Sequence, residues 1–156
     1  MRALLVAAFL ALTLPAVAQT QRLETTDVVR LADTDREWTV EVAETGREQA
    51  VGLMNRLSMP ARTGMLFDFG ASRDVTMWMR NTLIPLDMVF VCADGTVARV
   101  GRGEPLSEAI VASGEPVRYV LEINAGEAAA AGISRGAKLE TLSGERFDGT
   151  AEGCGA

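Results

Sequence analysis

The side chains that could do chemistry gather in and around one stretch of the chain, residues 64–87. They supply guanidinium, carboxylate, indole, amide and hydroxyl groups, and they are Arg47, Asp68, Trp78, Arg80, Asn81, Thr82 and Asp87. A guanidinium can hold a carboxylate or a phosphate, an indole can stack on a ligand, and amide and hydroxyl groups can fix its orientation. This set therefore predicts a candidate site for an anionic small molecule.

The same residues also suit a structural role. Several lie beside apolar neighbours, where an unpaired charge would cost several kcal/mol, so we expect them to pair with one another. Arg47 could pair with Asp68 or Asp87, while Asn81 and Thr82 suit a tight turn. A structural role is favoured for these two turn residues and for Arg47. Both roles stay open for Trp78, Arg80 and Asp87.

The chain contains no histidine, which limits its catalytic options. This removes the usual general base of hydrolases, the Ser-His-Asp arrangement and every zinc site that needs an imidazole. An enzyme would have to use a carboxylate and a guanidinium, with Asp87 beside Arg47 or Arg80 acting on an anionic small molecule. Because no complete catalytic set is present, we favour a small-ligand-binding or accessory module without catalytic activity, and we expect no cofactor.

Charge and sulfur content restrict the partners further. A formal net charge of -6 argues against nucleic acid or an anionic membrane as a partner, since both are bound by clusters of Lys and Arg. Thioethers can bind Cu(I), and Met77 and Met79 would share one face of a strand. Methionines at this spacing are more often packing residues. We therefore predict no metal site and keep Cu(I) binding as an alternative function.

The two cysteines are Cys92, in an apolar segment, and Cys154, near the end of the chain. A disulfide between them could add about 4 kcal/mol of stability in a chain-entropy model. An inward-facing Cys92 would be hard for a tail to reach, so two separate thiols are favoured. Neither cysteine belongs to a C-x-x-C motif, which makes thiol catalysis a poor fit.

The elements that position these residues are mostly strands. Alternating or continuous apolar patterns predict strands over residues 27–31, 38–42, 75–80, 86–91, 96–101, 117–124 and 137–142. Thr45 and Glu48 form a capping-box pattern that begins a short helix, and residues 127–131 predict a second one. Residues 101–116 read as a long crossing loop. Along the first helix a buried stripe is expected at Ala50, Leu53, Met54 and Leu57.

The strand patterns also predict which side chains share a face. Residues 75–80 should turn Val75, Met77 and Met79 to one face and Thr76, Trp78 and Arg80 to the other. Asp94-Gly95 predicts a hairpin in which Val89 faces Val100 and Val91 faces Ala98. Residues 117–124 should point Val117, Tyr119, Leu121 and Ile123 inward and Arg118, Glu122 and Asn124 outward.

Residues 1–18 have the three parts of a secretory signal peptide: a basic Arg2, an apolar run, and the cleavage pattern Ala16-Val17-Ala18. The apolar run is too short for a membrane anchor, so we expect a periplasmic or secreted protein with no stable membrane anchor after cleavage. The expected organisation is then a loose lead-in over 19–26, a single globular domain over 27–142 and a flexible Gly-rich tail over 143–156.

Several motifs in order resemble a known family. They are Arg47, Gly52-Leu53-Met54-Asn55-Arg56, Gly64-Met65-Leu66-Phe67, Trp78-Met79-Arg80-Asn81-Thr82 and Ile84-Pro85-Leu86-Asp87. Together they resemble the core signature of the DUF 192 family, a domain of unknown function. The resemblance implies a compact, β-rich and often exported domain with no agreed activity. We therefore predict an α+β, mostly β fold: a barrel-like, twisted antiparallel sheet with two short helices.

Overall fold

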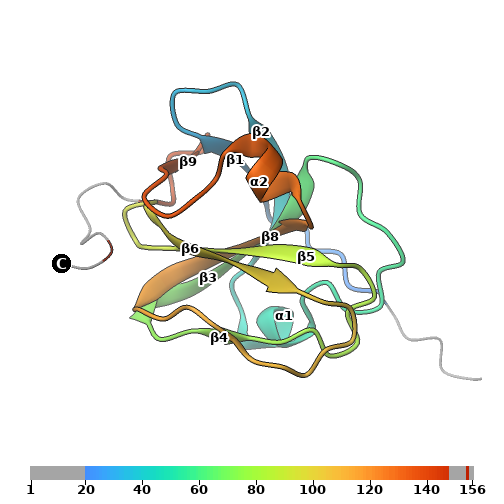
Figure 1. Ribbon diagram of the computed structural model, residues 1–156. Helices are drawn as coiled ribbons and strands as arrows, with labels where there is room; N and C mark the ends of the chain where they lie inside the picture. Colours follow the sequence, from blue (N-terminus) through green and yellow to red (C-terminus); the bar gives the residue numbers. More distant parts are fainter. Residues whose placement is uncertain (1–19, 148–153, 155–156) are drawn as a thin grey trace, which may run out of the picture.

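The computed structural model describes residues 20–147 and Cys154, so the expected signal peptide over residues 1–18 lies outside the described residues. The fold is mostly β with two short helices, as predicted (Figure 1). Its elements are β1 (Thr26–Leu31), β2 (Glu37–Ala43), α1 (Gly46–Val51), β3 (Thr63–Arg73), β4 (Thr76–Met77), β5 (Leu86–Val91), β6 (Val97–Gly103), β7 (Val111–Ala112), β8 (Val117–Asn124), α2 (Glu127–Ala131) and β9 (Leu139–Thr141).

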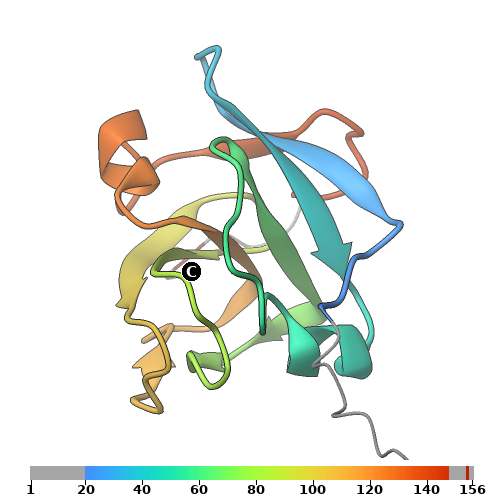
Figure 2. The same cartoon turned by 90° about the vertical axis from the view of Figure 1, so that its right-hand side faces the viewer.

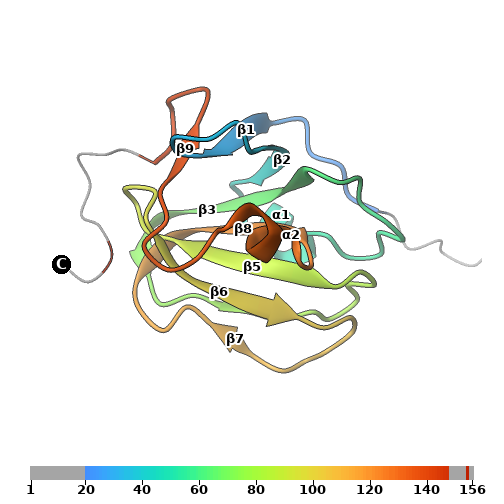
Figure 3. The same ribbon diagram turned by 45° about the horizontal axis from the view of Figure 1, so that its top comes forward.

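The main sheet has seven strands in the order β6-β5-β8-β3-β2-β1-β9. Neighbours run antiparallel except β2 and β3, which are parallel. The sheet curls until its two edges meet at one end, where Val97 N donates to Ala137 O at 2.8 Å and Leu139 N donates to Gly95 O at 2.9 Å (Figure 3). The barrel-like prediction is therefore confirmed.

Two apolar cores lie on opposite faces of the curled sheet. The barrel core lies inside, includes Leu66 and Leu121, and is covered by α2. The outer core includes Met65 and Met88 and lies on the other face of β3, β5 and β8, where α1 and the segment with β4 cover it (Figure 1). Both faces of the central strands are thus buried, which explains why all six residues of β5 are buried.

The predicted capping box at the start of α1 is confirmed. Thr45 Oγ1 accepts from Glu48 N, and the Glu48 carboxylate accepts from Thr45 N. The helix ends at Val51, earlier than the predicted stripe requires, because Gly52 follows with a φ of +47°. The predicted stripe is therefore wrong at both ends: Leu53 is buried in the outer core, but Ala50 within α1 is exposed and Leu57 is 86% exposed.

The strand predicted over residues 75–80 is shorter in the structure. Only β4 pairs, with β7, so the predicted crossing loop contains a strand. The rest of residues 75–80 is held to that loop by isolated hydrogen bonds and not by a regular strand ladder. For example, Ser113 N donates to Val75 O at 2.8 Å. The predicted faces still hold at three positions, because Val75 and Met79 are buried while Trp78 is exposed.

The hairpin of β5 and β6 keeps half of its predicted register. Val89 faces Val100 as expected, but Val91 faces Val97 instead of Ala98. The ladder shifts by one residue after Phe90, a β-bulge that the apolar pattern did not reveal. The turn glycine was read correctly: Gly95 has a φ of +88°, and a Cβ there would clash with Leu139 O.

The prediction of two separate thiols is wrong, because Cys92 and Cys154 form a disulfide with their Cα atoms 5.5 Å apart. Cys92 belongs to the outer core, where the tail can reach it, and not to the barrel interior. The described start of the expected tail is also held in place. Arg146 pairs with Asp27 at 3.0 Å, and the Phe147 ring packs edge-on against Tyr119.

The expected lead-in is attached to the domain in its described part. Leu23 N donates to the Glu41 carboxylate at 2.8 Å, and Gln21 Nε2 donates to Glu48 O at 3.0 Å. The Leu23 side chain packs against the outer core. These contacts place the segment before β1 alongside β2 and α1, and α1 borders the site described next.

Candidate functional site

A pocket of about 360 Å³ opens on the outer face of the sheet, beside α1. Figure 2 shows α1 and the segment carrying β4 below the main sheet, which is where this pocket lies. This volume is within the usual range of small-molecule sites. Its walls come from α1 and the turn after it (Gly46, residues 49–54), from β3 (Phe67, Phe69, Arg73), from β4 and its surroundings (Thr76, Met77, Trp78, Thr82), and from Ile110 and Glu122.

Glu122 is the unusual member of this wall. It lies on β8 and pairs in register with Met65 of β3 and Met88 of β5, both fully buried. Glu122 is only 4% exposed, and its carboxylate makes no hydrogen bond or ion pair with any residue between 20 and 147. Burial raises the pKa of Glu122 to about 8. The prediction that the Glu122 side chain points outward to solvent is therefore wrong, because the second face of β8 is covered as well.

The Gly64-Met65-Leu66-Phe67 motif of β3 supplies one pocket residue, Phe67, and packs β3 against the strand that carries Glu122. A Cβ on Gly64 would clash with the carbonyl oxygen of Glu122, so this glycine lets β3 and β8 approach. Met65 lies beside Glu122, and the Phe67 ring lines the pocket two residues further along. On the barrel side Leu66 packs in the other core. Alternate residues of one motif thus serve the core and the pocket.

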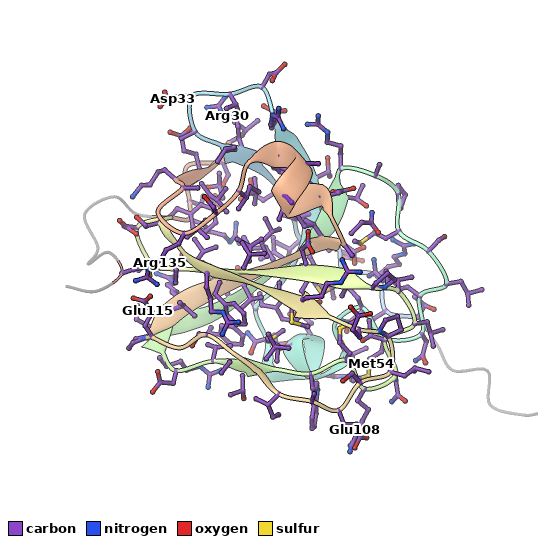
Figure 4. The ribbon with its side chains drawn as sticks, in the orientation of Figure 1. Arg30, Asp33, Met54, Glu108, Glu115 and Arg135 are labelled. Atoms are coloured by element: carbon purple, nitrogen blue, oxygen red, sulfur yellow. A yellow bond between two sulfur atoms is a disulfide. The ribbon has the colours of Figure 1, made fainter. Side chains whose placement is uncertain are left out.

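The turn after α1 forms one lip of the pocket, and the segment after β4 forms the other. Gly52 lies so close to the Phe67 ring that a Cβ would be 3.1 Å from it. Asn55 N donates to Asn81 O at 2.8 Å and joins the two lips. Asn81 has a φ of +56°, which suits asparagine and agrees with the predicted turn. Figure 4 labels Met54 beside α1 on this side of the molecule.

Arg56, the last residue of the Gly-Leu-Met-Asn-Arg motif, anchors that turn. It is 3% exposed and donates two 2.7 Å hydrogen bonds to the Glu41 carboxylate, one to each oxygen, and a third to Gln21 O. Burial acts to raise the pKa of Glu41, but the hydrogen bonds from Arg56 and Leu23 outweigh it and the pKa is lowered. This pair fixes the pocket lip to β2.

Four of the predicted site residues lie near this pocket: Trp78, Arg80, Thr82 and Asn81, the turn residue described above. Trp78, 46% exposed, and the buried Thr82 line it. The Arg80 guanidinium lies 4.8 Å from the centre of the Trp78 ring and pairs with Glu108 at 3.0 Å. Figure 4 shows Glu108 at the edge of the molecule on the same side as Met54. Arg80 is therefore engaged at the rim.

The predicted pairing of Asp68 and Asp87 with Arg47 or Arg80 is wrong. Asp68 is held by Arg118, with N–O distances of 3.0 and 3.2 Å. Arg47 is exposed on α1 and has no ion pair among the described residues. The two aspartates and Arg47 are therefore not brought together.

Asp87 has a different role, on the barrel side of the sheet. Its carboxylate accepts from Gly126 N at 2.8 Å and from Ala128 N at 3.0 Å. These are free N–H groups at the start of α2, where Gly126 offers no side-chain cap. Arg102 lies 3.8 Å away as a partly exposed cation. Asp87 is therefore the cap of α2, supplied from another strand.

Sequence reasoning missed Glu122, Gln49 and Phe67 as pocket residues. Gln49 Nε2 donates to Asp68 O at 2.7 Å and ties α1 to β3. The sequence of β5 contained a signal that Glu122 is buried. All six residues of β5 are buried, and a strand that is apolar on both faces has both faces covered. If β5 and β8 are neighbours, the acid on β8 must then be covered too.

The predicted methionine pair packs on one side, because Met79 belongs to the outer core and Met77 packs against that core, but the two differ in exposure. Met77 lines the pocket, whereas Met79 is buried in the outer core. Within residues 20–147, no three His, Cys, Asp or Glu side chains are grouped as a metal site would need. No helix in the described part of the chain is long and apolar enough to cross a membrane.

Comparison with known proteins places the chain in a group without assigned activity. The model of the family DUF192, described as "Uncharacterized ACR", matches residues 28–141. A crystal structure from Sinorhizobium meliloti, described as a "putative transcription regulator", is 45% identical, with a TM-score of 0.74, and the match covers 78% of this chain and 97% of that one. A protein of unknown function from Novosphingobium aromaticivorans is 38% identical, with a TM-score of 0.68, and the match covers 74% and 83% of the two chains. No functionally curated protein matches the sequence.

Proposed function

Because the chain belongs to the DUF192 family, which has no assigned activity, we propose its function from its own pocket: it is a binding module for a small molecule. One observation carries this proposal. A mostly apolar pocket of about 360 Å³ has a buried carboxylate without a described partner, Glu122, in its wall. A buried polar group that serves only the fold is normally paired, so an unpaired one at a cavity indicates a ligand.

A binding role fits the pocket better than a catalytic one. Glu122 is the only acid among the described lining residues, and Arg73 is the only base. No nucleophile lies there with a general base beside it, as covalent catalysis would require. Asp87, the acid of the enzyme alternative, is occupied by the N–H groups of α2. General acid–base catalysis by Glu122 is the second candidate, because its pKa of about 8 suits proton transfer near neutral pH.

We also propose that the protein works outside the cytoplasm and has no nucleic-acid partner. The Cys92–Cys154 disulfide supports an oxidising compartment. The net charge of -6 argues against nucleic-acid binding. The test of export is the intact mass of the secreted protein. This mass should correspond to a chain that begins near Gln19, and it should be lower than that of the reduced form by the mass of two hydrogens. Retention in the cytoplasm, or a chain that still begins at Met1, would contradict it.

The binding proposal is tested by ligand-induced thermal stabilisation. A ligand that binds only the folded state raises the melting midpoint, because it stabilises that state by RT ln(1 + L/Kd), where L is the free ligand concentration. Compounds of a size that fits the pocket should stabilise the wild type, and Ala50→Trp, which places an indole in the pocket from exposed Ala50 of α1, should remove the shift.

The matched control is Ala129→Trp, which makes the same change at an exposed position of α2, away from the pocket. It should retain every shift that the wild type shows. Stabilisation that persists in Ala50→Trp would place the ligand elsewhere and contradict the pocket as the site.

A further inference from the structure

We propose that the pocket selects an amphipathic organic cation, with an apolar body and one protonated amine that pairs with Glu122. This inference rests on the proposed small-molecule function and names the ligand class for the same site. It replaces the anionic ligand expected from the sequence, because the buried charged group of the wall is an acid, Glu122, whereas the arginine of the wall, Arg73, is exposed.

The position of Glu122 makes a partner from the protein itself hard to supply. Its neighbours across β3 and β5 are Met65 and Met88, which carry no charge. On β2, Glu41 pairs in register with Met65 and is thus the next acid across the sheet from Glu122. Glu41 is already paired with Arg56. Glu122 thus has an uncharged neighbour on each adjacent strand and lines the cavity.

The other charged group of the pocket wall does not serve as the partner. Arg73 is at the exposed end of β3, and its guanidinium lies over the Phe69 ring at 4.6 Å. It forms no ion pair with Glu122. Arg80, at the rim, is held by Glu108 and Trp78. Arg73 lines the pocket at an exposed position and Arg80 lies at its rim, whereas the acid is buried in the wall.

An ammonium ligand would complete this arrangement. A buried carboxylate without a partner is costly, and an amine at hydrogen-bond distance removes that cost with a charge-assisted bond. The rest of the pocket suits the body of such a ligand, because Met54 and Met77 are adaptable apolar surfaces and the Phe67 ring can face a cation. The acidic net charge of the chain also attracts cations at long range.

Binding of such a cation has a measurable consequence. In the empty pocket at pH 6.5 Glu122 is mostly protonated, since burial raises its pKa to about 8. Pairing with an ammonium group requires the carboxylate form, so the carboxyl proton passes to the buffer while the ligand keeps its own. The binding of one cation should therefore release close to one proton.

The experiment is titration calorimetry at pH 6.5 in phosphate and in the zwitterionic buffer ACES, whose different ionisation enthalpies report the protons released. The probes share a phenyl body: 2-phenylethylamine, 2-phenylethanol and 3-phenylpropanoate. We expect the amine to bind at least tenfold more tightly than the other two and to release close to one proton. Glu122→Gln should lose this preference and the proton release, whereas Glu104→Gln, at an exposed acid, should keep both.

Other outcomes overturn the inference in distinguishable ways. Equal binding of amine and alcohol without proton release, unchanged in Glu122→Gln, would reject the cation and leave the pocket as a small-molecule site. Tightest binding of the phenylpropanoate would restore the anionic ligand. No binding of any probe at millimolar concentration, with no thermal shift from a wider panel, would count against the cation and the proposed function together.

Discussion

At the scale of single residues, charge placement separates the side chains that hold the fold from the one that does not. Arg56 and Glu41 satisfy each other, as do Arg118 and Asp68. Glu122 is the exception, because it is buried but has no hydrogen-bond or ion-pair partner among the described residues. Two mutational predictions follow from this contrast, one for the unpaired acid and one for a paired base.

Glu122 should make the protein less stable as the pH rises through neutrality. Its pKa is about 8 in the folded state and 4.5 as a model value, so between these limits the folded state binds more protons than the unfolded state. Stability then falls with increasing pH, by at most about 5 kcal/mol in total, and is level above the folded pKa.

Urea unfolding at pH 5, 6.5 and 8 measures this slope. Glu122→Gln should flatten it, because an amide does not titrate in this range. The acids whose pKa values are lowered, such as Asp27 and Glu41, change stability only at lower pH and do not interfere. A wild type with equal stability at all three pH values would contradict the burial of a protonated Glu122.

Arg56→Ala should destabilise the protein by about 3 to 5 kcal/mol, since it leaves the Glu41 carboxylate largely buried without its cation. Urea unfolding of both single variants and of Arg56→Ala with Glu41→Gln gives the coupling energy. The matched control is Arg30→Ala, whose pairs with Glu37 and Glu140 are partly exposed and should contribute less than about 1 kcal/mol. Similar losses for the two arginines would show that burial of the pair is unimportant.

At the scale of elements, local patterns were predicted better than the contacts that join elements. The capping box of α1 and the turn at Asp94-Gly95 follow from neighbouring residues, and both were found. The alternation along β8 was found only in part, because Val120 and Glu122 are buried as well. Sequence could not show that Asp87 caps a helix 39 residues away from it, because that contact depends on the neighbouring positions of β5 and β8. The candidate site was therefore located only in part, at its rim.

Asp87→Ala should cost about 1 to 3 kcal/mol, because two N–H groups at the start of α2 lose their acceptor. Arg102→Ala should cost far less, and its coupling to Asp87 should stay below about 0.5 kcal/mol, since Arg102 is half exposed and 3.8 Å away. Urea unfolding measures both values. Strong coupling of Asp87 to Arg47 or Arg80 would contradict this cap and support the pairing expected from the sequence.

At the scale of the whole molecule, the chain closes on itself twice. Hydrogen bonds between residues 95–97 and 136–139 close the curled sheet, and the Cys92–Cys154 disulfide attaches the tail to the end of β5. Figure 4 labels a further surface pair, Glu115 with Arg135, on the side of the molecule opposite Met54. Sequence reasoning missed the disulfide because it took Cys92 to be inside the barrel, and only the curl of the sheet shows otherwise.

Replacing both cysteines with serine should lower the free energy of unfolding by about 4 kcal/mol, because the bond closes a loop with a sequence separation of 62. Urea unfolding of the oxidised protein, the reduced protein and the double variant measures this loss. The reduced wild type and the variant should agree. If neither differs from the oxidised protein, the tail contributes no constraint to the unfolded chain.

The same covalent loop would change how the protein responds to mechanical tension. A force applied to the two ends of the chain is carried by the disulfide and does not act on the residues between Cys92 and Cys154. These residues include β6, β8, β9 and the segments 95–97 and 136–139, whose hydrogen bonds close the sheet. An oxidised molecule pulled to full length would be about 210 Å shorter than a reduced one, at the usual span per extended residue. In an environment that breaks the bond, three of the seven strands of the main sheet, β6, β8 and β9, would also come under the applied force.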